Sequence, residues 1–346
     1  MKHRPWLIPV VTGVVLVLAA CGGGAAAPSS AAPATASAAP ASSSARPASS
    51  SAAASSKPAV SSAAASSSAA PGAKPTVRIG STNFSEQAVL GELYGQVLEA
   101  NGFKVERHFN LGNREIVEPA LESGKIDMDA EYLATLLAFV DKKAKPSTDP
   151  AETKKALEAA LQPKGLAVLD YAPAVDTNGF VVTKATADKY HLAKLSDLAP
   201  IGNQLILGGP AECPQRPFCQ VGLQKTYGIK FKDFKSLDAG GPLTVAALQG
   251  NQIDVGLLFT SDPTITAKAF VLLDDDKHLQ LSDNVAPVVR SDLLSKAGPD
   301  FPKLLNSVSA KLTTAQLTNL NKQVGVDKKD AKDVAAAWLK SQGLVK

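Results

Sequence analysis

An internal repeat constrains the fold of this chain more than any other feature of its sequence. Residues 120–127, ALESGKID, align without gaps to residues 247–254, ALQGNQID. The same offset carries Tyr132 onto Phe259. Each copy has the pattern of a helix that ends near Gly or Asn, followed by a buried strand that starts at Ile-Asp and then a loop. The repeat therefore predicts two halves that are built on one plan.

The segments around the repeat extend this plan. In both halves a β-rich run breaks at glycine, a loop and an amphipathic helix follow, and a second strand comes after a glycine stop. The predicted segments are a strand over 76–80, a helix capped by Ser85 that ends near 101–102, a strand from 103, and in the second half a strand over 205–207, a helix over 221–225 and a strand over 229–231. This alternation predicts an α/β fold with a mainly parallel sheet in each half.

The repeat also points to a binding site. Ligands of open α/β sheets bind beyond the carboxyl ends of the strands. Tyr132 and Phe259 each follow a predicted buried strand, so we expect them to face each other from two lobes across a cleft. The alternative is that each ring belongs to the core of its own half.

A tract rich in small residues precedes the globular part. Of the 54 residues from 22 to 75, 49 are Ala, Ser, Pro or Gly. Such a segment has too few apolar side chains to offset the entropy of ordering, so we predict a disordered tether. Residues 1–75 hold five basic residues and no acidic one, which leaves 31 basic and 32 acidic groups in the rest. The positive net charge therefore comes from the tail and does not indicate nucleic-acid binding.

The first 21 residues have the features of a lipoprotein signal peptide. A basic start is followed by an apolar run over 6–20, which is short for a membrane-spanning helix. The run ends in LAACG over 18–22, which resembles the lipobox of bacterial lipoproteins and implies lipid attachment at Cys21. The alternative is an ordinary signal peptide with a chance Cys. Either way, the body of the protein is expected outside the cytoplasm, and under the lipobox interpretation the lipid is its membrane anchor.

Cys213 and Cys219 are the other two cysteines of the chain. In an oxidising compartment, a pair at this short separation favours a disulfide over a metal site. The four histidines are scattered, so we predict no metal site and no cofactor. Arg216 lies at the middle of the loop that the disulfide would close.

Six short motifs stand out along residues 76–346. They are IGSTNFSEQ over 79–87, NLG over 110–112, ID at 126–127, EY at 131–132, GLQKTYG over 222–228 and APVVR over 286–290. Together they resemble the osmoprotectant-binding family of ABC importers, the glycine betaine, choline and carnitine receptors. The resemblance covers residues 76–346 and implies a two-lobed flytrap fold. Lobe 1 would comprise 76–177 and 286–346, lobe 2 would comprise 178–285, and the hinge crossings would lie near 176–179 and 284–287.

The resemblance implies an aromatic box that holds a quaternary ammonium by cation–π attraction. Tyr132 keeps its box position, with Thr135 one turn further on as a hydroxyl donor, and Phe259 replaces a Tyr and keeps the ring face. Asn178 and Asn284 stand where family members typically have Tyr in the two crossings. We therefore expect a larger or more hydroxylated ligand than glycine betaine.

Polar residues complete the implied site. Thr82, beside Asn83, stands where the family often has Lys. Glu212 and Arg216 keep their spacing of four, and Asp176 is retained. Arg216 is suited to gripping a ligand carboxylate with two hydrogen bonds. The alternative is a structural Arg216 paired with Glu212.

The resemblance implies a monomeric, lipid-anchored substrate-binding subunit that delivers a small solute to an ABC permease and its ATPase. Two alternatives stay open. One is a lipoprotein that presents a solute to a sensor. The other is an extracellular hydrolase with a carboxylate pair, but no His lies near a Ser or Cys motif and no glycine loop is suited to phosphate, so we predict that the chain is not an enzyme. The acidic residues that such a pair could use are Asp127, Asp129, Glu131, Asp176 and Asp262.

Overall fold

The structure is a computed structural model that describes residues 74–346. The predicted signal peptide, Cys21 and nearly all of the tether lie outside the described residues. Within residues 74–346, no helix combines the length and the apolar character that crossing a membrane requires.

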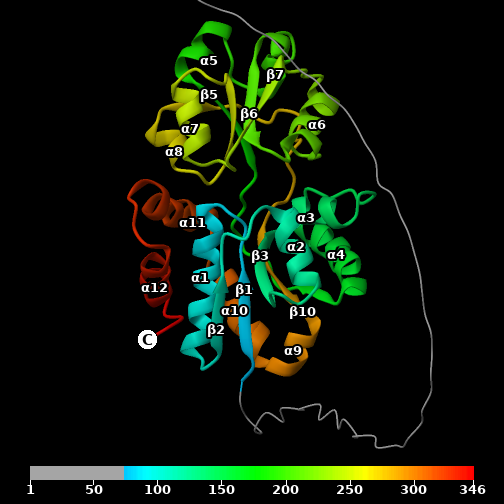
Figure 1. Cartoon of the computed structure of the whole chain (residues 1–346), viewed down its shortest axis with the longest axis vertical. Helices are drawn as coiled ribbons and strands as arrows, with labels where there is room; N and C mark the ends of the chain where they lie inside the picture. The colour runs from blue at the N-terminus through cyan, green and yellow to red at the C-terminus, as the bar shows by residue number, and fades with distance from the viewer. Residues whose placement is uncertain (1–73) are drawn as a thin grey trace, which may run out of the picture. The chain divides into compact units, whose positions relative to one another are not determined.

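In the described residues, ten strands form two five-stranded sheets (Figure 1). The first sheet has the order β2-β1-β3-β10-β4 and the second the order β7-β6-β8-β5-β9. We call the first sheet with its helices lobe 1 and the second with its helices lobe 2. The strands are β1 Thr76–Gly80, β2 Lys104–His108, β3 Met128–Tyr132, β4 Leu166–Val168, β5 Asn178–Thr183, β6 Ile206–Pro210, β7 Asp233–Leu237, β8 Val255–Phe259, β9 Phe270–Leu272 and β10 Val285–Arg290.

Helices cover both faces of each sheet. The α-helices are α1 Ser85–Ala100, α2 Arg114–Glu122, α3 Leu133–Val140, α4 Pro150–Leu161, α5 Lys184–Tyr190, α6 Gln220–Gly222, α7 Pro242–Gln249, α8 Thr264–Ala267, α9 Ser291–Ala297, α10 Asp300–Ser309, α11 Thr314–Asn321 and α12 Ala331–Ser341. Short 3₁₀ and π turns are η1 Gln162–Lys164, η2 Leu195–Leu198, η3 Gly202–Gln204, η4 Cys213–Gln215, η5 Leu223–Tyr227 and η6 Lys322–Val326.

Each sheet is mainly parallel, as the sequence predicts. β1 pairs in parallel with β2 and β3, and β6 pairs in parallel with β7 and β8. One strand of each sheet runs in the opposite direction: β10 is antiparallel to β3 and β4, and β5 is antiparallel to β8 and β9. The chain passes between the sheets on its way into β5 and again on its way into β10. The two crossing segments are joined by a bridge between Val175 and Asn284.

The core of each lobe lies in two layers, one on each face of its sheet. In lobe 1, α1, α10, α11 and α12 pack on one face, while α2, α3 and α4 pack on the other (Figure 1). The large apolar residues of α1, which are Val89, Leu90, Leu93, Tyr94, Val97 and Leu98, recur at helical spacing and are buried, which explains why this segment forms the central helix of its layer. In lobe 2, α5 and α6 cover one face and α7 and α8 the other.

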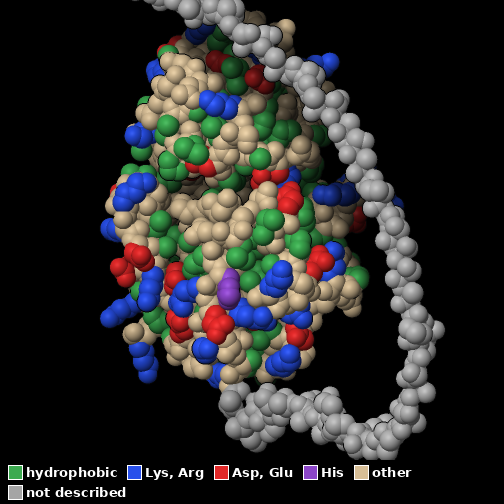
Figure 2. Space-filling view, viewed as in Figure 1, with side chains coloured by type: hydrophobic (Ala, Val, Ile, Leu, Met, Phe, Trp, Pro, Cys, Tyr) green, Lys and Arg blue, Asp and Glu red, His purple; other side chains and the backbone are tan. Residues whose placement is uncertain are grey.

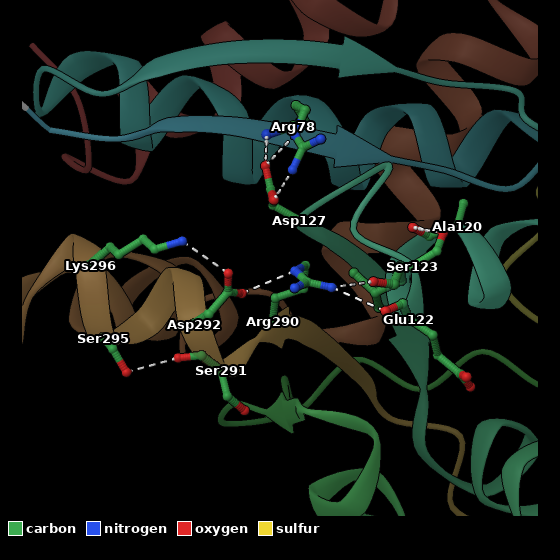
Figure 3. Close-up of polar contacts among 11 residues, drawn as sticks. Arg78, Ala120, Glu122, Ser123, Asp127, Arg290, Ser291, Asp292, Ser295 and Lys296 are labelled. Atoms are coloured by element: carbon green, nitrogen blue, oxygen red, sulfur yellow. Dashed lines mark hydrogen bonds and ion pairs between the residues drawn. The ribbon is translucent and has the colours of Figure 1, made fainter. Parts of the chain in front are cut away.

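In both lobes the Asp of the Ile-Asp motif binds the backbone of the neighbouring strand. Asp127 accepts a hydrogen bond from the backbone N–H of Arg78 on β1 at 2.9 Å, and Asp254 accepts one from the N–H of Ile206 on β6 at 2.8 Å. Figure 3 shows Asp127 beside Arg78, whose guanidinium adds an ion pair at 2.6 Å. The motif thus ties the first strand of each sheet in place, because its Asp binds the backbone in the middle of β1 and at the start of β6.

The isoleucine of the motif explains a glycine in each first strand. A side-chain carbon added at Gly80 would come within 2.3 Å of Ile126, and one added at Gly208 would come within 2.5 Å of Ile253. Glycine therefore lets the isoleucine pack directly on the strand, which is a second reason why the repeat recurs.

Two local predictions are wrong. Ser85 is the first residue of α1 rather than its cap; the capping position is Phe84, whose side chain makes no capping hydrogen bond. Residues 229–231 form no strand, because β6 pairs instead with β7 a few residues later, while Ile229 is buried in the core of lobe 2.

Charges of both signs are interspersed on the visible surface of the described residues (Figure 2). This agrees with the near balance of basic and acidic residues beyond the tail.

Candidate functional site

A cavity of about 120 Å³ is lined by residues of both lobes. Nine of the ten predicted ligand-binding residues line it: Thr82, Asn83, Tyr132, Thr135, Asp176, Asn178, Glu212, Arg216 and Phe259. Tyr132 ends β3 and Phe259 ends β8, so the two equivalent strands deliver the two predicted rings to the same cavity. The interpretation of Phe259 as a purely internal core residue is therefore wrong.

Asn284 does not line the cavity. Its amide nitrogen donates to the carbonyl of Ala172 at 2.9 Å and helps join the two crossing segments. The strand register explains this correction. Asn178 lies opposite Phe259 in lobe 2, whereas the residue opposite Tyr132 in lobe 1 is Val285, one position beyond Asn284.

Five aromatic side chains line the cavity, of which the sequence predicted two. The other three are Phe84, Phe139 and Phe218. Phe84 stacks on Phe259 with ring centres 4.9 Å apart and on Tyr132 with ring centres 6.4 Å apart. A surface of aromatic faces is suited to a cationic group with methyl substituents, because such a cation is attracted to π faces and gives up little hydration.

Tyr132 is fixed by a buried polar network. Its hydroxyl donates to Glu86 and accepts from the amide of Gln87 at 3.2 Å. Glu86 also accepts from Ser261 of lobe 2 at 2.8 Å and from Asn321 of lobe 1. Glu86 therefore links a ring of the cavity with both lobes.

Burial raises the pKa values of the two carboxyl groups near Tyr132. It raises the pKa of Glu86, and the hydrogen bonds from Tyr132, Asn321 and Ser261 oppose this change. Burial, followed by the nearby charge of Glu86, raises the pKa of Asp176 well above its ordinary value. Asp176 accepts from the backbone N–H of Ser261 at 2.7 Å, so its role in the structure is to join the crossing segment to lobe 2.

The loop that carries Arg216 is closed by a disulfide between Cys213 and Cys219. Arg216 does not pair with Glu212. Its guanidinium donates to Glu115 on α2 of lobe 1 at 2.8 Å and lies over the ring of Phe139 at 5.2 Å. Burial, followed by the charge of Arg114, lowers the pKa of Arg216. The guanidinium Nε makes no hydrogen bond with a described residue.

Glu212 directly precedes this loop and also contacts lobe 1. It accepts a hydrogen bond from the side chain of Asn113 at 3.2 Å. Arg216 and Glu212 thus hold α2 through two polar contacts at the rim of the cavity.

A second ion pair, which the sequence did not predict, lies deeper. Arg114 on α2 donates two hydrogen bonds to Glu131 on β3, at 2.7 and 2.6 Å, and a third to Thr135 at 3.1 Å. Thr135 therefore has its hydroxyl engaged by Arg114, and its backbone N–H donates to Asp283 at 2.8 Å. Burial alone would lower the pKa of Arg114, but the carboxylate of Glu131 raises it above its ordinary value.

Two other predicted residues, Thr82 and Asn178, differ in the hydrogen bonds that their side chains make. Thr82 is buried, and its hydroxyl makes no hydrogen bond with another described residue. Asn178 donates through its amide nitrogen to the carbonyl of Phe218 at 3.0 Å.

Among residues 74–346, no cluster of three His, Cys, Asp or Glu side chains is arranged to hold a metal.

The comparison with known proteins decides the family. A family model described as the substrate-binding domain of ABC-type glycine betaine transport systems matches residues 75–341. The chain belongs to this family. The glycine betaine-binding protein YehZ of Escherichia coli (strain K12) is 31% identical over 282 residues, which cover 78% of the chain and 92% of YehZ.

Further relatives in the glycine betaine-binding family carry other ligand names. The carnitine transport binding protein OpuCC of Listeria monocytogenes (strain 10403S) is 28% identical to the chain. This match covers 77% of the chain and 86% of OpuCC. The ergothioneine transport permease/ergothioneine binding protein EgtU of Helicobacter pylori (strain G27) is 28% identical; the match covers 78% of the chain but 48% of EgtU.

Solved structures of the glycine betaine-binding family agree with the fold. A crystal structure of a glycine betaine/carnitine/choline ABC transporter protein superimposes with a TM-score of 0.62 at 28% identity, covering 78% of this chain and 99% of the other. Apo YehZ gives a TM-score of 0.56 at 30% identity, with coverage of 78% and 99%. The two-lobed periplasmic-binding-protein fold is confirmed.

Family membership confirms that the chain is a substrate-binding protein of an ABC importer, which partners a permease and acts outside the cytoplasm. The relatives are solute-binding proteins and not enzymes, so the prediction that the chain is not an enzyme is confirmed as well.

Proposed function

We propose that the protein captures a small compatible solute, a quaternary ammonium or a similar zwitterion, between its two lobes and delivers it to the permease. The observation that carries the proposal is the cavity to which equivalent strands bring Tyr132 and Phe259. The relatives named for glycine betaine, carnitine and ergothioneine support a cationic or zwitterionic ligand.

In this proposal the rings of Tyr132 and Phe259 hold the cationic end, and Arg216 holds a carboxylate. Arg216 is suited to this task because its Nε has no described partner and because Glu115, its present partner, is exposed. A ligand carboxylate that replaces Glu115 gains two parallel hydrogen bonds in a water-poor site. Asn178, Thr82 and Gln87 supply further hydrogen-bonding groups at the wall of the cavity.

The expected preference for a solute larger or more hydroxylated than glycine betaine now rests on Asn178 and Thr82, since Asn284 lies outside the cavity. A thermal-shift screen of the full chain against betaines, choline, carnitine, ectoine, amino acids and sugars tests the ligand class. We expect the strongest shift from a cationic or zwitterionic solute. A response to sugars or to anions alone would contradict the aromatic-box proposal, and tight binding of glycine betaine would contradict the expected size preference.

The role of Arg216 is tested with ligands that differ in one group. Arg216→Ala is expected to weaken binding of carboxylated solutes such as betaines or carnitine far more than binding of choline. Arg216→Lys is the matched control: it keeps the charge but loses the two-pronged geometry, so it should recover only part of the affinity. Equal losses for choline and carnitine would show that Arg216 acts through the loop and not through a carboxylate.

We further propose that lipid on Cys21 anchors the mature protein and that the lobes close about the crossings near 176–179 and 284–287. The bridge between Val175 and Asn284 supports a common hinge. Cys21→Ser is expected to release the protein from the membrane fraction. A variant that still fractionates with membranes would contradict attachment at this residue.

A further inference from the structure

Phe84 occupies ring faces that a bound cation would use. It stacks on Phe259 at an interplanar angle of 29° and on Tyr132 at 22°. A quaternary ammonium held by Tyr132 and Phe259 needs the same faces, because cation–π attraction is strongest over the face of a ring. The solute and Phe84 therefore compete for one place.

Phe84 also lines two cavities. The cavity described above has a volume of about 120 Å³, which is below the range of roughly 300–1,000 Å³ typical of ligand pockets. A second cavity of about 680 Å³ lies beside it, between the start of α1 and η6 in lobe 1 and the region of α7 and α8 in lobe 2. Both cavities are bordered by Asn83, Phe84, Ala239 and Phe259.

Of the three stacked rings, Phe84 is the least constrained. Tyr132 is 7% exposed, and its hydroxyl is held by Glu86 and Gln87. Phe259 ends a strand and is backed by Gly240, where an added carbon would lie 3.0 Å from the ring. Phe84 is half-buried, carries no polar anchor and lies in the loop between β1 and α1.

We propose that Phe84 is a movable gate and a specificity-determining residue of this receptor. In the solute-free protein the Phe84 ring covers the cation position. When a solute binds, the ring turns toward the larger cavity and exposes the faces of Tyr132 and Phe259 to the solute. The inference rests on the proposed function of the site. It follows that the measured affinity is lower than the intrinsic affinity of the box, because the gate must first be displaced. It also follows that the larger cavity limits how bulky a solute the receptor accepts.

Calorimetric titration of the full chain with the solutes of the screen tests the gate. Phe84→Ala is expected to bind about tenfold more tightly than the parent, which is ~1.4 kcal/mol, with the largest gain for the bulkiest solute. Phe234→Ala is the matched control, since Phe234 on β7 is also half-buried but lines neither cavity. It should bind like the parent. Unchanged or weaker binding by Phe84→Ala would overturn the proposal and make Phe84 an ordinary wall of the site.

A second measurement does not depend on a truncated side chain. 4-Fluorophenylalanine placed at position 84 should show a ¹⁹F resonance that moves to a new position at saturating solute, while the same label at position 234 should not move. A resonance at position 84 that stays in place at saturation would overturn the gate while leaving the receptor function intact. If no solute binds the parent or either Phe84→Ala or Phe84→Leu, the proposed ligand class fails and the gate fails with it.

Discussion

The equivalent strands β3 of lobe 1 and β8 of lobe 2 bury different kinds of side chain: β3 buries carboxyl groups where β8 buries apolar residues or glycine. β3 has the sequence MDAEY and β8 the sequence VGLLF, and both are central strands that end at a ring of the cavity. Asp129 and Glu131 of β3 thus correspond to Gly256 and Leu258 of β8. The helix on this face differs in the same way: Glu118 of α2 corresponds to Val245 of α7.

This difference shows that the fold does not require polar side chains on this face of the sheet, so their role in lobe 1 belongs to the ligand site. In lobe 2 the face is filled by Leu258, Leu248 and Val245, so the architecture is stable with apolar packing there. In lobe 1 the same face holds carboxyl groups and Arg114, which also lines the cavity. Buried ion pairs are weak evidence for stability. We therefore attribute this polar face to positioning Thr135 and the start of α3 beside the ligand cavity.

The largest expected effect comes from breaking the ion pair of lobe 1. Arg114→Met leaves Glu131 buried without its partner and is expected to lower the free energy of unfolding by about 3–5 kcal/mol. Urea denaturation measures this. Adding Glu131→Leu, which copies the residue of lobe 2, should restore most of the loss. Arg78→Met is the control, because the Arg78 side chain is 36% exposed and its loss should cost less. A double variant as unstable as Arg114→Met would show that the lobes are not interchangeable on this face.

A second test uses pH. Burial, followed by the charge of Glu131, raises the pKa of Glu118 from 4.5 to about 7. The protonated acid therefore favours the folded state, and its stabilising effect is complete below about pH 4.5 and is lost as the pH rises through about 7. Glu118→Gln, which stays neutral, should be more stable than the parent at pH 8 by on the order of 3 kcal/mol and equal to it near pH 4.

Unfolding experiments at pH 4, 6 and 8 check this. Glu122→Gln on the same helix is the control, because Glu122 is exposed and its carboxylate pairs with Lys164 at the surface at 2.6 Å. A gain for Glu118→Gln that does not change with pH would show that the carboxyl is not desolvated as described.

The third test concerns a feature of lobe 2 alone. Closing the loop of Cys213 and Cys219 is expected to contribute about 2 kcal/mol in the chain-entropy model. Replacing both cysteines by Ser should weaken solute binding more than it destabilises the lobes, because the loop carries Arg216, while the two cysteines are a small part of the lobe 2 core to which they belong. Calorimetry and denaturation of the same variant compare the two effects. A large loss of stability with unchanged affinity would contradict this role of the loop.

The sequence predicted those parts of the structure that depend on short-range patterns. The Ile-Asp motif placed both central strands, because its Asp binds the backbone of the neighbouring strand, β1 or β6, and its Ile packs on a glycine of that strand. The positions of Tyr132 and Phe259 at the cavity followed from the offset of the repeat.

The contacts that the sequence did not reveal join residues far apart in the chain. Arg216 meets Glu115 because α2 of lobe 1 lies at the disulfide loop, so the alternative that paired Arg216 with Glu212 on their spacing of four is wrong. Asn284 was misplaced because a shift of one residue decides which side chain lies opposite Tyr132 in the antiparallel pair. Phe84 and Glu86 stood in a recognised motif, but their roles depend on Ser261 and Phe259 of the other lobe.

The central claim is that one ligand site is built from equivalent residues of both lobes. Titration calorimetry of Tyr132→Ala and Phe259→Ala with the solute that binds most tightly tests it directly, with Phe234→Ala as the control. We predict that each of the two variants loses on the order of 1–3 kcal/mol of binding free energy, about 5- to 150-fold in affinity, while the control binds like the parent. Parent-like affinity in either variant, with the other impaired, would show that a single lobe holds the solute.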